Sequence, residues 1–250
     1  MKSNNTLAPI AYPKQIQDFA SKSFFERTGK HLAENESFFE LSGKQEICRI
    51  VLGCGRLYVS ANEEYFDTIS DYLHSVRIYE RITTPVFYKE ILGVLGLDSS
   101  KFLLEPSEEF VQNIRYNVFH TLDFACTAET FKPREYNNIR MIKRGDEQYI
   151  LDDSFDDTMY CITDQGHFIS TGYFKPNTGL FDNTCSMEVF TRPDYRKRGY
   201  GTASASAATQ AIVKNGKCAL WVCQIENYAS RKIAESLGYI LLGGQLRIVT

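Results

Sequence analysis

The chain has 250 residues, of which 43% are apolar and 13% aromatic. This composition can fill a hydrophobic core, so it excludes a disordered chain and allows one large domain or two small ones. The 28 Lys and Arg residues stand against 31 Asp and Glu, which gives a net charge of −3. Binding to nucleic acid or to an anionic membrane through overall charge is therefore excluded, and any anion site must be local.

The seven cysteines are odd in number, and none shows C-x-x-C spacing, so we expect no zinc or redox site. Several of them, including Cys161 and Cys185, lie in apolar runs and are predicted to be buried strand residues. The four histidines are scattered, and no metal is expected. The N-terminal stretch MKSNNTLAPIAYPKQ has no apolar core, so no signal peptide is predicted. Without an apolar run of about 20 residues, we expect a cytoplasmic protein.

The first half of the chain mixes helical and strand patterns. Apolar spacing predicts helices within residues 13–34, 62–76 and 85–97, and two short strands within residues 47–62. From about Ala125 to Asp153 polarity rises, which indicates a boundary or a loop lining a cleft.

In the second half, glycine and proline mark the ends of the predicted strands and helices more clearly. The pattern predicts a hairpin turning at Asp164–Gly166, a strand at 185–191, a helix at Thr202–Lys214, a buried strand at 218–225, a helix at 227–237 and a final hairpin turning at Gly243–Gly244. This order predicts a mixed α/β sheet rather than a Rossmann unit.

The stretch RPDYRKRGYG, residues 192–201, combines basic side chains with two glycines before a helix. A helix start offers unpaired N–H groups and the positive end of the helix dipole, which together bind phosphate. Gly199 and Gly201 would let a ligand approach the backbone closely. The spacing matches neither a P-loop nor the dinucleotide motif G-x-G-x-x-G. A solvated basic surface is the alternative interpretation.

This loop resembles the acetyl-coenzyme A loop of the GNAT acetyltransferases, whose signature is (Q/R)-x-x-G-x-(G/A). Two further segments, ALWVCQI at 219–225 and NYASRKIAESLGY at 227–239, resemble the family at the expected distances. The resemblance covers about residues 155–250, and it looks closest to the branch of the zwittermicin A resistance acetyltransferase. Over the first half it extends only to length and general character.

The resemblance implies an α/β (α+β) GNAT fold, with a mixed central sheet whose strands splay and are flanked by helices. The GNAT domain would occupy residues 126–250. Residues 1–125 would form a smaller N-terminal α/β domain and one wall of the acceptor cleft.

The same resemblance assigns site residues for acetyl-coenzyme A as co-substrate. The backbone of Val189, Phe190 and Thr191 would contact the pantetheine arm, and one N–H there could polarise the thioester carbonyl. Asn227 and Ser230 would bond that arm or an ordered water; the alternatives are a helix N-cap and plain first-turn polarity. The pyrophosphate would be held by Arg196, Lys197, Arg198, Gly199, Tyr200, Gly201 and Thr202.

The implied reaction transfers an acetyl group to a primary amine of a small molecule by direct attack in a ternary complex. Glu188, on the strand beside the co-substrate, is the candidate general base, although a structural, paired Glu is the alternative. Many relatives have a tyrosine acid where this chain has Ala234, so the general acid stays open.

Other polar residues have two interpretations each. His120 and Asp123 could line a substrate cleft or be surface polarity, and Asp152–Asp157 could attract a cationic amine or form a solvated turn. A non-catalytic acyl-coenzyme A sensor and transfer to a protein amine are the competing functions. We expect no nucleic-acid or membrane partner, and a homodimer stays open.

Overall fold

The structure is a computed structural model that describes residues 13–33, 36–104, 117–143, 158–178 and 182–250. The chain divides into two compact units. The first contains the residues up to Asp123 together with 223–228 and 241–250, and the second contains 124–222 and 229–240. The last strand therefore returns to the first unit, whereas the sequence placed it with the second half.

The first unit is built on a sheet in the order β1-β3-β2-β10. Strand β1 (Ser37–Leu41) pairs in parallel with β3 (Arg56–Ala61), and β3 pairs antiparallel with β2 (Glu46–Gly53). Strand β10 (Ile240–Val249) runs antiparallel to β2, and β4 (Val118–Cys126) belongs to this unit up to Asp123.

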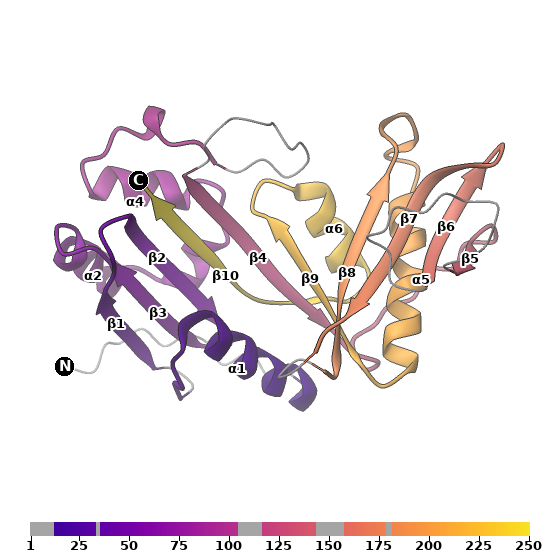
Figure 1. The fold of residues 1–250 in the computed structure, drawn as a ribbon, viewed down its shortest axis with the longest axis horizontal. Helices are drawn as coiled ribbons and strands as arrows, with labels where there is room; N and C mark the ends of the chain where they lie inside the picture. The colour runs from indigo at the N-terminus through magenta and orange to yellow at the C-terminus, as the bar shows by residue number, and fades with distance from the viewer. Residues whose placement is uncertain (1–12, 34–35, 105–116, 144–157, 179–181) are drawn as a thin grey trace. The chain divides into compact units, whose positions relative to one another are not determined.

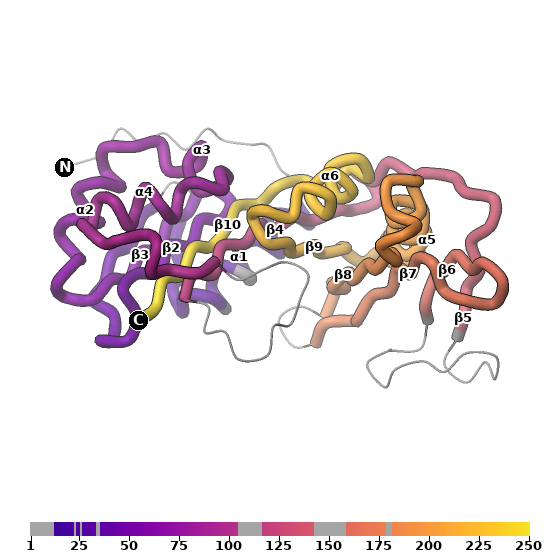
Figure 2. Tube along the Cα trace, turned by 90° about the horizontal axis from the view of Figure 1, so that it is seen from above, coloured from indigo at the N-terminus to yellow at the C-terminus, as the bar shows by residue number. Residues whose placement is uncertain are grey.

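Helices cover both faces of this sheet. On one face α2 (Phe66–Ser75), α3 (Ile78–Ile82) and α4 (Phe87–Val94) lie together, as Figure 2 shows, followed by the 3-10 turn η1 (Ser99–Lys101). Their apolar residues form the main core with Ile50, Leu52 and Val59 of the strands. On the other face α1 (Lys14–Thr28) inserts Phe24 against Val51 and Tyr58.

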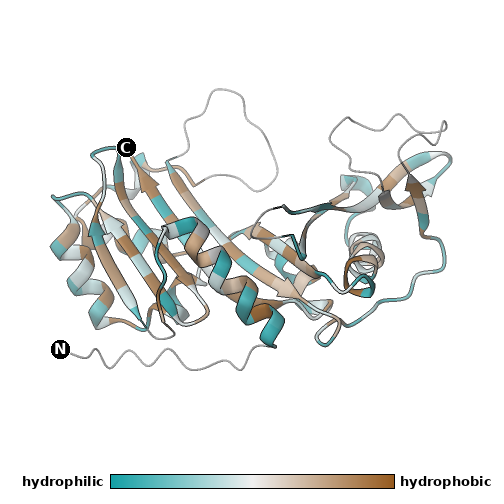
Figure 3. Ribbon diagram, turned by 60° about the horizontal axis from the view of Figure 1, so that its bottom comes forward, coloured by the Kyte–Doolittle hydropathy of each residue, from teal (hydrophilic) through white to brown (hydrophobic). Residues whose placement is uncertain are grey.

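Alternation along the strands explains this division. Successive residues of a strand point to opposite faces, so Val51 faces α1 while Ile50 and Leu52 face the main core. Figure 3 shows that α1 mixes hydrophobic and hydrophilic residues along its length, as expected for a helix with one face in solvent.

The predicted final hairpin is wrong, because β10 is one continuous strand. Gly243 pairs with Gly53 of β2, and a Cβ atom on Gly243 would lie 1.9 Å from the Leu52 carbonyl oxygen. The Gly243–Gly244 pair therefore allows two backbones to approach closely and does not make a turn.

The second unit contains a sheet in the order β9-β8-β7-β6-β5. Its strands are β5 (Arg140–Lys143), β6 (Thr158–Asp164), β7 (His167–Pro176), β8 (Thr184–Thr191) and β9 (Cys218–Gln224). All neighbours are antiparallel except β8 and β9, which are parallel and joined through helix α5 (Tyr200–Lys214). Helix α6 (Tyr228–Ser236) follows β9.

Helix α5 lies very close to β7. A Cβ atom on Gly172 of β7 would lie 2.4 Å from the carbonyl oxygen of Ser204, so only glycine fits there. The small residues Ala203, Ser204 and Ala205 of α5 are buried, which allows this helix to lie close to the sheet.

The predictions for the cysteines are confirmed as far as burial is concerned, since all seven are buried free thiols. Within the described ranges, no three His, Cys, Asp or Glu side chains gather as a metal site would require. No helix of the described residues has both the length and the apolar character that a membrane crossing demands.

Candidate functional site

The basic loop leads from β8 into α5. After the 3-10 turn η3 (Pro193–Tyr195), Lys197 and Gly199 both adopt positive φ angles, of 61° and 83°. Helix α5 begins at Tyr200, two residues earlier than the predicted start at Thr202, and its N-cap Gly199 offers no side chain to cap the helix. The start of α5 is therefore without the side-chain acceptor that helices usually supply.

The first-turn N–H groups of α5 belong to Tyr200, Gly201 and Thr202. In the part of the chain that the structure describes, no acceptor pairs with them, and the first bond of the helix runs from Ala203 N to Gly199 O at 3.0 Å. Together with the helix dipole, these donors favour an anion at this point. The residues present thus suit a phosphate group.

The two glycines of the loop have different roles. A Cβ atom on Gly199 would meet nothing within 4 Å, so glycine is required there by its φ of 83°. On Gly201, a Cβ atom would lie 2.9 Å from Thr191 Oγ1 and 3.3 Å from Ile233 Cδ1. Gly201 therefore allows α5 to contact β8 and α6, which differs from the expected role of giving a ligand access.

The basic side chains surround this helix start. Arg196 donates from Nε to the Thr191 carbonyl oxygen at 3.1 Å, which ties the loop to β8. The guanidinium of Arg198 lies 5.4 Å from the ring centre of Tyr195. Within the described ranges no carboxylate pairs with Lys197 or Arg198, and both are exposed, so their charge is available to an anion.

Aromatic rings border the same loop. Tyr200 packs edge-on against Tyr136, with ring centres 5.8 Å apart, and it also contacts Tyr195 at 6.3 Å. The Tyr195 hydroxyl donates to Asp164 Oδ2, and this bond, followed by the charge of Asp164, raises the pKa of Tyr195. These contacts fix Tyr200, the first residue of α5, in place.

Strands β8 and β9 separate beside the loop. Their ladder joins Thr184–Ser186 to Cys218–Leu220 and ends there, although β8 continues to Thr191. In Figure 1 the two strands meet at one end and diverge toward the other. The second half of β8 therefore has an open edge on the β9 side, as the predicted splay requires.

Backbone hydrogen bonds alternate along β8, and this alternation decides which residues direct their N–H and C=O groups toward the open edge. Asn177 N donates to Thr184 O and Arg192 N donates to Ile169 O, so the even-numbered residues of β8 bond to β7. Val189 and Thr191 consequently direct their N–H and C=O groups toward the gap. Phe190 does not: its backbone faces β7, and its carbonyl also accepts from Ser170 Oγ, so only two of the three predicted backbone contacts lie on the open edge.

Glu188 is exposed on the sheet face opposite to α5. Its carboxylate accepts a hydrogen bond from the hydroxyl of Tyr173, the residue directly across on β7. Tyr173 is not among the site residues predicted from the sequence. The signal was present in the hairpin register, because residues that oppose each other across antiparallel strands share a face.

The predicted residues of α6 are placed less directly. Ser230 Oγ accepts from Trp221 Nε1 at 2.8 Å, which joins α6 to β9. Asn227 belongs to the segment 223–228 of the first unit, and its N–H donates to Gln224 O. Ala234, at the position of the tyrosine acid in many relatives, is fully buried.

His120 and Asp123 lie in the first unit, and neither is a fully exposed polar side chain. His120 is fully buried, and burial lowers its pKa to about 4, with its Nε2 bond to the Ile82 carbonyl opposing the shift. Asp123 forms a two-point ion pair with Arg27 of α1. The acidic residues 152–157 lie outside the described residues.

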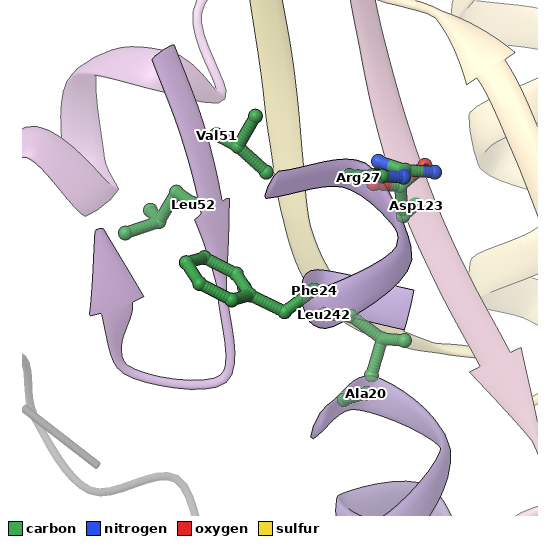
Figure 4. Close-up of a pocket in the computed structure, with 8 residues that line it drawn as sticks. Ala20, Phe24, Arg27, Val51, Leu52, Asp123 and Leu242 are labelled. Carbon is green, nitrogen blue, oxygen red and sulfur yellow. Dashed lines mark hydrogen bonds and ion pairs between the residues drawn. The ribbon is translucent and has the colours of Figure 1, made fainter. Parts of the chain in front are cut away.

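The Arg27–Asp123 pair borders a small apolar pocket, seen in Figure 4, of about 20 Å³. This volume holds roughly one water molecule. Burial lowers the pKa of Arg27, but the charge and hydrogen bond of Asp123 more than offset this and leave it raised. Because Arg27 already neutralises Asp123, this carboxylate is a weak attractor for a cationic substrate.

Part of the chain resembles a known protein family. Residues 160–243 match the model of the GNAT acetyltransferase family, whereas the curated proteins gave no match. Among solved structures, a GNAT-family protein of Novosphingobium aromaticivorans is 14% identical over 54% of this chain and 64% of its own, with a TM-score of 0.45. The chain thus spans less than two thirds of that protein.

Two further solved structures are similar. An acetyltransferase from the GNAT family of Colwellia psychrerythraea is 12% identical over 51% of this chain and 55% of its own, with a TM-score of 0.42. A GCN5-related N-acetyltransferase of Sphaerobacter thermophilus is 10% identical over 82% of this chain and 80% of its own, with a TM-score of 0.40. Residues 160–243, which contain the basic loop and the parallel β8–β9 pair, therefore resemble a GNAT acetyltransferase domain.

Proposed function

We propose that this protein transfers an acetyl group from acetyl-coenzyme A to a primary amine of a small molecule, by direct attack in a ternary complex. The observation that supports it best is the start of α5 beside the open edge of β8: it has no side-chain cap, and among the described residues its first-turn N–H groups have no acceptor and Lys197 and Arg198 have no carboxylate partner. Membership of the zwittermicin A resistance branch is part of this proposal.

The residues of the loop would divide the work of binding. The N–H groups from Gly199 to Thr202 would hold the pyrophosphate, and Lys197 and Arg198 would add positive charge. The backbone groups of Val189 and Thr191 would bond the extended pantetheine arm as a neighbouring strand would. Acetyl-coenzyme A would supply the acetyl thioester, and the Val189 N–H, which points into the gap, could polarise its carbonyl group.

Glu188 would handle the proton of the acceptor. A primary amine is mostly ammonium at neutral pH, and it must lose a proton before its nitrogen can attack. The Glu188 carboxylate, exposed on the open-edged half of β8, would accept that proton directly or through water. The departing thiol has no assigned acid, because Ala234 is buried and carries no proton.

Binding can be tested with two matched glycine variants of one helix. Gly199 and Gly216 flank opposite ends of α5, both have positive φ, and neither has an atom within 4 Å of an added Cβ. We expect Gly199→Val and Gly216→Val to lose similar stability, while only Gly199→Val loses acetyl-coenzyme A binding by calorimetry. Equal affinity in both variants would refute the loop assignment.

Catalysis is tested by Glu188→Gln with a panel of primary amines and a thiol-release assay. Turnover should fall strongly at neutral pH and much less at high pH, because the amine is then neutral in solution and needs no base. An equal loss at every pH would argue against the base role. Binding of acetyl-coenzyme A without turnover of any small amine would favour the sensor, and turnover with peptides alone would favour a protein acceptor.

A further inference from the structure

Tyr173 and Glu188 form a cross-strand pair on the sheet face of the second unit that is opposite to α5. They are direct partners in the β7–β8 register, and the hydrogen-bond phase makes this a hydrogen-bonded pair of the ladder. The two residues therefore exchange both of their backbone N–H to C=O hydrogen bonds, which holds their backbones together. The phenol O–H of Tyr173 donates to Oε2 of the Glu188 carboxylate.

The tyrosine ring is held in place from the other side. It packs against a small core of Ile142, Met159 and Cys161, all buried. The ring is thus anchored in the sheet, while its hydroxyl reaches an exposed carboxylate. A flexible, exposed Glu side chain gains one preferred orientation from such an anchored donor.

The position of Glu188 along β8 relates its contact with Tyr173 to the proposed proton transfer. Glu188 lies two residues beyond Ser186, where the ladder to β9 ends. At Glu188, β8 is therefore paired with β7 and not with β9. Tyr173 engages Oε2, so the second carboxylate oxygen, Oε1, is not part of this hydrogen bond. That oxygen is the one suited to meet the acceptor amine or its water.

We infer that Tyr173 is a positioning residue for proton removal by Glu188, which rests on the proposed function of this site. In that step an N–H bond of the acceptor ammonium breaks, the proton goes to the Glu188 carboxylate and the electron pair stays on nitrogen. Tyr173 neither donates nor accepts this proton; it holds the carboxylate in the orientation that receives it.

The test is a double-mutant cycle of Tyr173→Phe and Glu188→Gln, assayed with acetyl-coenzyme A and the best amine of the panel. Tyr173→Phe should lower kcat about tenfold, as expected for losing one hydrogen bond to a charged group, and leave the Kd of acetyl-coenzyme A unchanged. In the Glu188→Gln background it should cost nothing further. Tyr160→Phe is the matched control, because Tyr160 pairs with Gly172 and so lies on the opposite face.

Each outcome is informative. An equal loss from Tyr173→Phe in both backgrounds, or no loss in the wild type, would overturn the positioning role while leaving the proposed function intact. No loss from Glu188→Gln would instead remove Glu188 as the base. A crystal structure of Tyr173→Phe needs no acceptor: the Glu188 carboxylate should change rotamer or spread over several, and an unmoved carboxylate would count against the inference.

Discussion

The two units treat their polar groups in opposite ways. In the first unit, Asp123 is neutralised by Arg27, and His120 is buried in its neutral form with a bond to the Ile82 carbonyl. In the second unit, the start of α5 has no cap, Lys197 and Arg198 have no carboxylate partner in the described ranges, and Glu188 is exposed. The Arg27–Asp123 pair is satisfied internally and stabilises the fold, although His120 Nδ1 has no partner among the described residues; the groups left open at the start of α5 can serve a ligand. Changes in the first unit should therefore alter stability, and changes in the second should alter binding.

The largest effect on stability should follow from Arg27→Ala. This change leaves the carboxylate of Asp123, 14% exposed, without its partner. We expect a loss of about 3 kcal/mol in the free energy of unfolding, measured by urea denaturation at neutral pH. The control is Arg231→Ala, which removes a more exposed pair with Glu235 and should cost about 0.5 kcal/mol or less. Similar losses in both variants would contradict the contrast.

A smaller effect should appear as acid sensitivity due to His120. Burial lowers its pKa from 6.5 to about 4, so between these values the unfolded chain binds a proton that the folded protein does not. The free energy of unfolding should therefore decrease as the pH is lowered, by about 2 kcal/mol from pH 8 to pH 5. In His120→Gln, which keeps a donor for Ile82, this part of the pH dependence should vanish, and an unchanged slope would assign it to other groups.

The smallest effect on stability is expected in the basic loop. Because their side chains are exposed and unpaired with carboxylates in the described ranges, replacing Lys197 and Arg198 together by Ala should change the free energy of unfolding by less than about 0.5 kcal/mol. The Kd of acetyl-coenzyme A should rise about tenfold, and its dependence on salt should weaken. A stability loss with unchanged affinity would reverse the comparison between the units.

Local chemistry made the loop and its neighbours predictable from sequence. The turn at Asp164–Gly166, the strand at 185–191, the helix after Gly199 and the helix ending before Gly238 are all present, because glycine marks backbone conformations that depend on a few residues. The family signature rested on the same stretch, and the model match to residues 160–243 covers it.

The features that escaped prediction depend on partners distant in sequence. Gly243–Gly244 looks like a turn until Leu52 is placed against it, and the pairing of Asp123 with Arg27 joins residues 96 positions apart. The roles of Gly201 and Phe190 likewise depend on Thr191, Ile233 and the phase of the β7–β8 ladder. Spacing along the chain carries no signal for such contacts, which arise from sheet register and from the packing of helices on the sheet.

The pairing of β10 with β2 matters for the design of a truncated N-terminal fragment. This strand, from the end of the chain, pairs with β2 from Gly53 to Glu46, so a fragment of residues 1–125 would lack it. In such a fragment the edge of the hydrophobic strand β2 would be unpaired and exposed, and exposed strand edges promote self-association. Anyone seeking a separately expressible N-terminal piece would do better to graft the last ten residues back onto it through a short linker.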